Sequence, residues 1–282
     1  MVRSEPSRNW ETTAKGWTRW ATVLERGMRA ISDRLIALGR IPPTGRILDI
    51  ATGIGEPALT VAQYMGERGQ IIAIDRSLQM LSAAHRRIGV FSFSNVAFLQ
   101  MDAERLGFPP STFHAVLCRF GLMFLRDLKA ALETIRSLLA PGGRFAAAVW
   151  GPPEHVPLLA VALGPVHEAL SLPAPAPGEP GPFRLAAAPL LLQALREAGF
   201  VQLHIEYLRI EIVFSSVAEY VEAIRALLPE RQHVEHLPTT RQILLWEEVA
   251  QRAHAYQDER GFVRFPNTVI CIAGMRDLDD TW

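Results

Sequence analysis

Short runs rich in β-branched and aromatic residues alternate with helical patterns over the first 150 residues. The runs lie at 46–51, 70–75, 96–101, 113–120 and 144–150. Between them, apolar residues recur every three or four positions, and Asp127 and Pro141-Gly142-Gly143 are placed to begin and end one such helix. This alternation predicts an α/β fold, a Rossmann-like doubly wound sheet of about seven mostly parallel strands with helices on both faces.

The pattern changes after residue 150. Nine of the 20 prolines fall within residues 151–182, which predicts a loop or mobile connector. Helical patterns follow near 186–198, 216–224 and 240–257, and β patterns near 200–213 and 267–275. Ser216 and Glu219 have the spacing of a capping box at the start of the second of these helices. The two helices before the last strand are expected to form an inserted helical cap.

The length of 282 residues is compatible with one or two domains, and 49% hydrophobic with 21% charged residues is typical of a globular chain. We expect a single domain over 1–282. Its cofactor-binding core would span 45–150, and the Pro-rich loop 151–183 with the cap 214–260 would form the substrate side.

Charge and cysteine usage narrow the function classes. The 29 basic and 29 acidic residues balance, which gives no support to nucleic-acid or membrane-surface binding. Cys118 and Cys271 stand in apolar surroundings, so we expect buried thiols in a reducing compartment. No Cys/His spacing indicates a metal site, and no apolar segment is typical of a signal peptide or a membrane span. A cytoplasmic monomer or homodimer is expected.

The segment from Asp49 to Pro57 carries the most chemical information. It reads D-I-A-T-G-I-G-E-P, follows a predicted strand and opens a helix. Gly53 and Gly55 let the backbone turn sharply and approach a ligand closely. Asp75 ends the next strand, 20 residues after Gly55, where a carboxylate can accept hydrogen bonds from ribose hydroxyls. The pattern therefore predicts a site for a nucleoside-containing cofactor.

Two cofactor classes fit this loop. Gly53, Gly55 and Ala58 match the dinucleotide pattern G-x-G-x-x-A. Asp49, in the same strand as the loop, and Asp102, at the end of the third strand, favour S-adenosylmethionine (SAM) instead. The Asp102 carboxylate, at the end of the third strand, can accept a hydrogen bond from an adenine amino group.

Several stretches together resemble class I SAM-dependent methyltransferases, in particular the family of ubiquinone/menaquinone-biosynthesis methyltransferases. The matching stretches are ILDIATGIGEPAL, AIDRSLQMLSAA, MDAERLGFPPSTFHAV, CRFGLMFLRD and LLAPGGRFAAAVW. The resemblance covers about residues 45–150. It implies SAM as cofactor, S-adenosylhomocysteine as product, no metal, and a small-molecule acceptor.

The resemblance also implies roles for individual residues. Glycines 53 and 55 would pass under the methionine and ribose, Asp75 would bind the ribose, and Asp49 would hold the loop or meet the methionine amino group. The full set of implied cofactor-binding residues is Asp49, Ala51, Thr52, Gly53, Gly55, Asp75, Arg76, Met80, Asp102, Ala103, Arg119 and Phe120. Ala51 stands where a glycine is commoner, a tolerable change if its φ is negative. His114 stands where relatives usually have Asp.

The acceptor side is expected to be apolar and aromatic. Trp17, Trp20, Trp150 and Met123 are the candidate substrate and lid residues, and the variable segments 1–22, 151–183 and 214–260 would form the pocket. His155 follows the fifth strand and is the best-placed candidate for a general base.

These observations favour transfer of the SAM methyl group by in-line displacement to a small apolar or aromatic acceptor. Two alternatives remain at this point. The same glycine loop serves NAD-dependent oxidoreductases, although neither Lys15 nor Lys129 has the Tyr four residues earlier that one common dehydrogenase type needs. The fold could also act as a non-catalytic SAM sensor or partner module.

Overall fold

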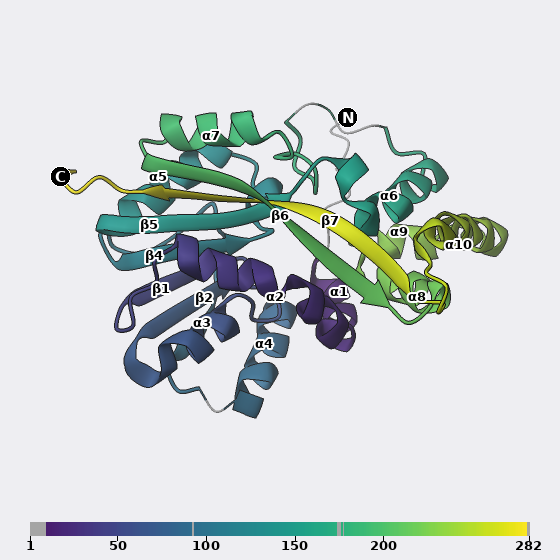
Figure 1. Ribbon diagram of the computed structural model, residues 1–282, viewed down its shortest axis with the longest axis horizontal. Helices are drawn as coiled ribbons and strands as arrows, with labels where there is room; N and C mark the ends of the chain where they lie inside the picture. The colour runs from purple at the N-terminus through teal and green to yellow at the C-terminus, as the bar shows by residue number, and fades with distance from the viewer. Residues whose placement is uncertain (1–9, 92, 174–175, 177, 281–282) are drawn as a thin grey trace. The chain divides into compact units, whose positions relative to one another are not determined.

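The computed structural model describes residues 10–91, 93–173, 176 and 178–280, and its chain divides into two compact units (Figure 1). The core unit comprises Arg29–Pro152, Pro177–Arg209 and Thr268–Trp282. The accessory unit comprises Met1–Met28, Pro153–Ala176 and Ile210–Asn267. The expectation of a single domain stays a prediction.

A seven-stranded sheet is the centre of the core unit, and the last two strands along the chain continue into residues of the accessory unit. Its strands are β1 (Arg46–Ile50), β2 (Gln70–Asp75), β3 (Val96–Gln100), β4 (Phe113–Arg119), β5 (Leu139–Trp150), β6 (Val201–Phe214) and β7 (Val263–Met275). The order is β3-β2-β1-β4-β5-β7-β6. The pairs from β3 to β5 are parallel, and β7 is antiparallel to β5. The predicted fold class is confirmed.

Helices cover both faces of this sheet. They are the second half of α2 (Ala21–Leu38), α3 (Ala58–Met65), η1 (Gly66–Arg68), α4 (Leu78–Phe91), η2 (Leu122–Phe124), α5 (Leu128–Leu138) and α7 (Ala188–Glu197). Helices α2, α3 and α4 lie on one face and α5 and α7 on the other (Figure 1). With helices on both faces, the central strands must be apolar along their whole length.

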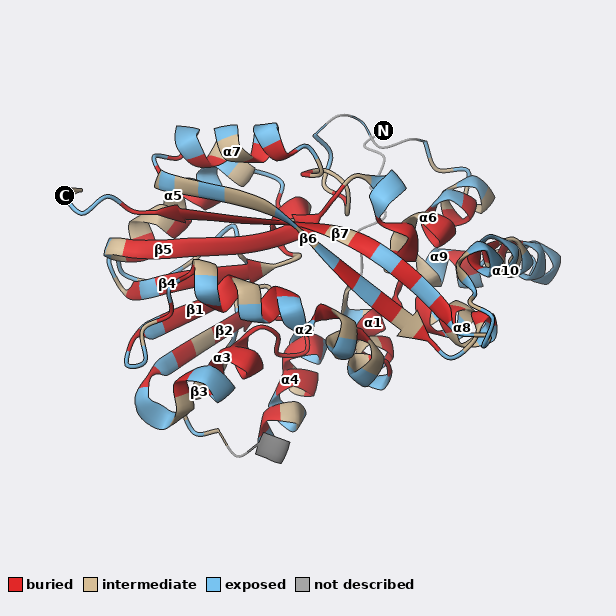
Figure 2. Cartoon of the chain, in the orientation of Figure 1, coloured by how far each residue is buried: buried red, intermediate tan, exposed pale blue. Residues whose placement is uncertain are grey.

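Burial follows this arrangement. The side chains of β1, β4 and β5 are largely buried, whereas the edge strand β3 is partly exposed (Figure 2). The predicted cap of α5 is confirmed, because the Asp127 carboxylate accepts the Ala130 backbone N–H at 3.0 Å. Leu132 and Ile135 of that helix are fully buried. The helical pattern at 127–139 therefore encoded both the cap and the packed face.

The order of strands places a topological switch point at β1 and β4. From β1 the chain moves outward to β2 and β3, then returns to β4 on the other side of β1. The helices that follow β1 and β4 consequently lie on opposite faces, and ligands of open α/β sheets bind outside the carboxyl ends at such a point. The turns that follow Ile50 and Arg119 lie at this edge.

A buried arginine fixes the far end of the core unit. Arg276 follows β7 and is 1% exposed. Its Nη1 donates to Ser111 Oγ at 2.9 Å, to the Ser137 carbonyl at 3.2 Å and to the Leu139 carbonyl at 2.6 Å. These bonds tie the last strand to α5 and to the start of β5.

The accessory unit is mainly helical. Its helices are α1 (Trp10–Arg19), the first part of α2, η3 (Pro153–His155), α6 (Pro157–Ala169), α8 (Val217–Leu227), α9 (Arg231–Glu235), α10 (Thr239–Ala253) and η4 (His254–Tyr256). The prediction of a loop over 151–182 is wrong for residues 157–169. Pro157 suits the first turn of α6, and Leu158 and Ala162 bury its apolar face despite Pro165 inside the helix.

The accessory unit has its own aromatic core. Tyr220 is fully buried between Phe214 and Phe265, with ring centroids 5.4 and 4.5 Å away. Its hydroxyl donates to the Leu158 carbonyl at 2.9 Å, and burial raises its pKa. The capping bond expected at the start of α8 is present, because Ser216 Oγ accepts the backbone N–H three residues later at 3.1 Å. No helix in the described part of the chain is long and apolar enough to cross a membrane.

Candidate cofactor site

The turn between β1 and α3 is built from left-handed backbone. Ala51, Gly53 and Gly55 have φ angles of 57°, 56° and 105°. A Cβ on Gly55 would lie 3.0 Å from Leu59 Cδ1, a tight contact with α3, and the positive φ itself favours glycine there. A Cβ on Gly53 would meet nothing within 4 Å, so the space beside this backbone is open. The two glycines therefore form a turn whose backbone a ligand can approach.

Ala51 departs from the expectation. The condition under which alanine would be tolerated, a negative φ, is not met, because the turn needs a left-handed residue at this place. A side chain there costs about 1–2 kcal/mol. Its Cβ stands 2.7 Å from where a Cβ on Gly121 would lie. The turns after β1 and β4 thus touch, and only glycine fits at position 121. Strain of this kind persists mainly at ligand and catalytic sites.

Asp75 holds this turn to the next strand. Its Oδ2 accepts the Gly53 N–H at 2.9 Å and its Oδ1 accepts the Ser77 N–H at 2.8 Å. Each carboxylate oxygen can accept more than one hydrogen bond. Asp75 is 9% exposed and shapes the turn through these two bonds.

Asp49 is the most unusual group of the site. Its Oδ2 accepts the Ala58 N–H at 3.0 Å and so satisfies the first amide of α3, while its Oδ1 is buried without a hydrogen-bond partner. Burial raises the pKa of Asp49 to about 7, against the opposing effects of Thr52, Ala58 and the Arg119 charge. Thr52 Oγ1 lies near enough to favour the carboxylate, yet makes no hydrogen bond of ordinary geometry. A buried oxygen with no partner marks a place where a ligand donor fits.

The end of β3 connects to the segment after β4. Asp102 Oδ1 accepts the backbone N–H of Glu104, which fixes the turn that includes Ala103. Glu104 Oε1 in turn accepts the backbone N–H groups of Arg126 at 2.9 Å and Asp127 at 2.8 Å. The predicted adenine-edge residues thus lie on an ordered turn.

An aromatic stack stands at the ends of β4 and β5. Phe120 has a φ of 62°, and its ring lies on Trp150 with 4.1 Å between centroids and 15° between planes. Arg119, just before it, donates from Nη1 to Ser32 Oγ of α2 at 3.1 Å. Met123 is buried in η2, next to this segment. The ends of β4 and β5 thus carry one charged group and one aromatic surface.

The remaining predicted residues are placed as follows. Met80 is 4% exposed in α4, and Ser77 Oγ accepts its backbone N–H at 3.1 Å. Arg76 is exposed, directly after Asp75. Ser77 was missed in the sequence, although a serine three residues before a helical position is an N-cap signal.

Trp17, Trp20 and His155 belong to the accessory unit. Trp20 is 7% exposed with its ring edge-on to Phe214 at 6.4 Å, and Trp17 is half-buried in α1. His155 is exposed in η3 and makes no hydrogen bond to another described residue. Residues 1–9 of the predicted pocket segment 1–22 lie outside the described residues. The lid, pocket and general-base roles stay predictions.

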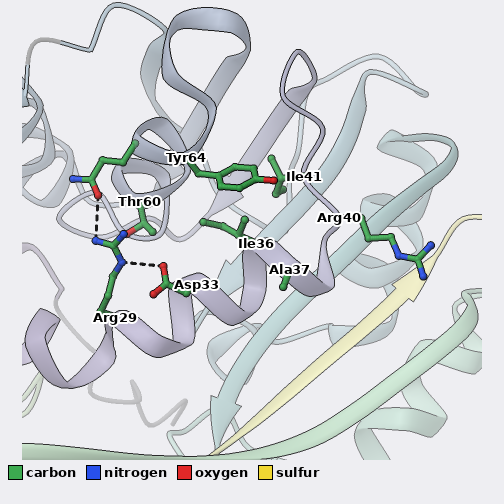
Figure 3. Close-up of a pocket in the computed structure, with 9 residues that line it drawn as sticks. Arg29, Asp33, Ile36, Ala37, Arg40, Ile41, Thr60 and Tyr64 are labelled. Carbon is green, nitrogen blue, oxygen red and sulfur yellow. Dashed lines mark hydrogen bonds and ion pairs between the residues drawn. The ribbon is translucent and has the colours of Figure 1, made fainter.

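Figure 3 shows a pocket of about 610 Å³ elsewhere on the core unit. It is lined by α2, the turn after it, and α3 near the amino ends of β1 and β2. Arg29 there already donates to Asp33 and Gln63. None of the predicted site residues lines this pocket. Among the described residues, no three His, Cys, Asp or Glu side chains group in a way that could hold a metal ion.

Comparison with known proteins bears on the same segment. The family model described as "Methyltransferase domain" matches residues 47–143, which include β1, the glycine turn and the strands up to β5. Residues 47–143 form a methyltransferase domain. The resemblance deduced from the sequence is thereby confirmed.

Relatives and solved structures agree with this assignment. The ubiquinone/menaquinone biosynthesis C-methyltransferase UbiE of Coxiella burnetii is 33% identical over 136 residues, 47% of this chain and 54% of that protein. The chain thus spans about half the length of the curated relatives it matches. The YcgJ protein from Bacillus subtilis has a TM-score of 0.57 at 18% identity, covering 88% of this chain and 99% of that one.

A further structure comes from Haemonchus contortus. Phosphoethanolamine N-methyltransferase 2, in complex with phosphomonomethylethanolamine and S-adenosylhomocysteine, has a TM-score of 0.52 at 18% identity. The alignment covers 93% of this chain and 53% of that one. At these identities the solved structures show that the methyltransferase domain shares their fold.

Proposed function

We propose that this protein transfers the methyl group of SAM to a small apolar or aromatic acceptor. The observation that carries the proposal is the pair of carboxylates around the glycine turn. Asp49 offers a buried oxygen without a partner, and Asp75 offers a carboxylate already fixed to the turn. The relatives' printed names, C-methyltransferase and N-methyltransferase, support the same reaction class.

The residues present fit the cofactor. Asp49 Oδ1 would accept a hydrogen bond from the methionine ammonium, and the open backbone at Gly53 would pass beneath it. Asp75 would accept the ribose hydroxyls. Asp102 and Ala103 would lie at the adenine edge, with Arg76 and Met80 beside the ring, as the family resemblance implies.

When bound, SAM supplies a methyl carbon that its sulfonium already makes electrophilic. The protein's part is to align the acceptor with that carbon and to exclude water. The Phe120–Trp150 stack offers a flat apolar surface for this alignment, which favours a planar acceptor. A general base is needed only where the acceptor is a hydroxyl or an acidic carbon. His155 is the candidate we retain for that role.

The negative charge at the turn argues against the alternative of an NAD-dependent oxidoreductase. In dinucleotide sites the pyrophosphate lies at the glycine turn and the helix that follows it. Here the Asp49 carboxylate occupies the first amide of α3, and its ionised form would repel a phosphate. A cationic group is complementary to this carboxylate instead, and SAM carries both an ammonium and a sulfonium.

Calorimetric titration tests the proposal. We expect SAM and S-adenosylhomocysteine to bind and NAD not to bind. Asp75→Ala should weaken SAM binding by at least tenfold, because it removes the bonds to the ribose and to the Gly53 amide. The matched control is Asp33→Asn, which removes an exposed carboxylate of α2. This variant should bind SAM as tightly as the parent protein does. Tight binding of NAD with no binding of SAM would overturn the proposal.

Activity separates an enzyme from a SAM sensor. With methyl-labelled SAM, we expect label in at least one member of a panel of phenols, quinols and amines. Binding of SAM with no labelled product from any acceptor would support the sensor alternative.

A further inference from the structure

Arg144 is a buried arginine at the opposite edge of the sheet from the glycine turn. It stands at the amino end of the segment of β5 that pairs with β7, six residues before Trp150, which is about 20 Å of extended strand. The residue is 8% exposed. Its Nε donates to the Leu38 carbonyl at 3.2 Å and its Nη1 donates to Gln202 Oε1 at 3.3 Å. Both of these acceptors are uncharged, and a buried charge ordinarily needs an opposite one.

A second arginine adds positive charge instead. Arg40 comes two residues after the α2 carbonyl that Arg144 contacts. Burial lowers the pKa of Arg144, and the nearby charge of Arg40 lowers it further. Figure 3 shows the Arg40 side chain pointing away from Arg29 and Asp33. Among the residues that the structure describes, neither the Arg40 nor the Arg144 guanidinium pairs with a carboxylate. Two like charges thus stand together, one of them buried, which is unfavourable unless an anion joins them.

The backbone at Arg40 supports a role for its side chain. The Arg40 N–H donates to the Ala37 carbonyl at 3.2 Å and the Ile41 N–H donates to the Ile36 carbonyl at 3.3 Å, the two bonds of a Schellman motif. In this motif, the residue that Arg40 supplies is left-handed and is usually glycine. Arg40 has a φ of 45°. The chain therefore carries an arginine where the backbone favours glycine, and such strain is found mainly at ligand and catalytic sites.

We propose that Arg40 and Arg144 bind the phosphate group of a small dissolved molecule at this edge of the sheet. The pair carries two positive charges on two different segments of the chain. A phosphate group is the matching ligand, because it carries nearly two negative charges and has enough oxygens to accept hydrogen bonds from two guanidinium groups. A carboxylate has one charge and two oxygens, which a single guanidinium satisfies. The site does not involve the glycine turn, so the inference is independent of the proposed function.

Gln202 and the end of α2 complete the surroundings. Gln202 also has left-handed backbone, with a φ of 47°, and its side-chain oxygen fixes Nη1 of Arg144. An alternative is that the two arginines only stabilise the carboxyl end of α2, whose carbonyl groups carry a partial negative charge. The two interpretations differ in whether phosphate binds and in whether its binding requires Arg40.

Calorimetric titration with inorganic phosphate and with methyl phosphate tests the proposal, at low ionic strength and with acetate as the reference anion. We expect one phosphate to bind per chain, and acetate to bind at least about tenfold more weakly. In Arg40→Gln, phosphate affinity should fall by roughly 10- to 100-fold, as is typical of hydrogen bonds between charged groups. The matched control is Arg29→Gln, which removes an exposed arginine of α2 that pairs with Asp33. This variant should bind phosphate as tightly as the parent protein does.

Two further variants remove phosphate binding without weakening the fold. Gln202→Glu keeps an oxygen for Nη1 of Arg144 and places a carboxylate beside the buried guanidinium. Because that carboxylate supplies the counter-charge itself, we expect a higher melting temperature in phosphate-free buffer and a loss of phosphate binding. Arg40→Gly should also lose phosphate binding, and its melting temperature should not fall, because glycine suits the left-handed backbone.

Each outcome decides a different point. If the parent protein binds no phosphate up to about 10 mM, or if Arg40→Gln binds it equally well, the site is overturned and the helix-end alternative stands. Acetate binding as tight as phosphate binding would overturn the assigned ligand class. Equal binding of methyl phosphate would identify a phosphate ester as the ligand, and binding of inorganic phosphate alone would identify free phosphate. SAM affinity should be the same in Arg40→Gln and the parent protein, so failure of either proposal leaves the other intact.

Discussion

The buried carboxylate of Asp49 should make the ligand-free protein less stable than the same protein with a neutral residue there. Asp49→Asn is the informative change, because the amide oxygen can still accept the Ala58 N–H while the charge is gone. The asparagine NH₂ group would stand where Oδ1 now lacks a partner. We therefore expect this variant to be more stable than the parent protein and to bind SAM less well.

The pKa of Asp49 gives the magnitude. It rises from 3.8 to about 7 on folding, and one pKa unit corresponds to about 1.4 kcal/mol. Because the folded-state pKa lies above the unfolded one, stability is full below about pH 4 and falls as the pH rises through about 7. At pH 8.5 the carboxylate costs about 4 kcal/mol, and at pH 5 only about 1.5 kcal/mol.

Urea unfolding at these two pH values measures the effect. After removal of any bound cofactor, the advantage of Asp49→Asn over the parent protein should grow by about 3 kcal/mol between pH 5 and pH 8.5. Other titrating groups are common to both proteins and cancel in the comparison. Asp33→Asn, which removes an exposed carboxylate paired with Arg29, should show no such growth. A difference that is the same at both pH values would refute the reasoning.

Three further predictions concern stability and reactivity of the core unit. Ala51→Gly should raise the free energy of unfolding, measured in urea, by roughly 0.5–1 kcal/mol. Gly121→Ala should lower it by about 2 kcal/mol, and this loss should be smaller when Ala51 is also replaced by glycine. Purely additive effects would show that the turns after β1 and β4 do not touch. Arg276→Gln should lower the melting temperature, because it leaves buried carbonyls unpaired at a cost of about 3 kcal/mol; an unchanged midpoint would contradict this. Cys118 and Cys271, whose pKa values burial raises to about 12, should resist iodoacetamide at pH 8 until urea unfolds the chain.

The hydrophobic pattern of the chain predicted the elements well where burial alone decides the structure. The runs at 70–75 and 113–120 became β2 and β4 because helices cover both faces and demand continuous apolar residues. The Pro-rich region was misread over α6, because proline frequency outweighed an apolar run that packs when given a partner surface. Local composition cannot report such a surface.

The candidate site divides in the same way. The spacing of Gly53, Gly55 and Asp75 revealed a cofactor turn, since turn geometry is a property of a few consecutive residues. No sequence signal pointed to Ser32, because its hydrogen bond with Arg119 depends on the register of β1 with β4 and on where α2 lies. The left-handed Ala51 was likewise invisible, because a backbone angle is set by the turn as a whole.

By itself, then, the sequence determined the order of strands and helices along the chain, the cofactor turn and the resemblance to methyltransferases. All three depend on the spacing of residues that are close together in the sequence. Only the tertiary structure decided which side chains meet. It left one oxygen of Asp49 buried without a partner and brought Arg119 from β4 to the same turn. Charges separated by 70 residues act together because parallel strands end at a common edge, and that proximity follows from topology and packing.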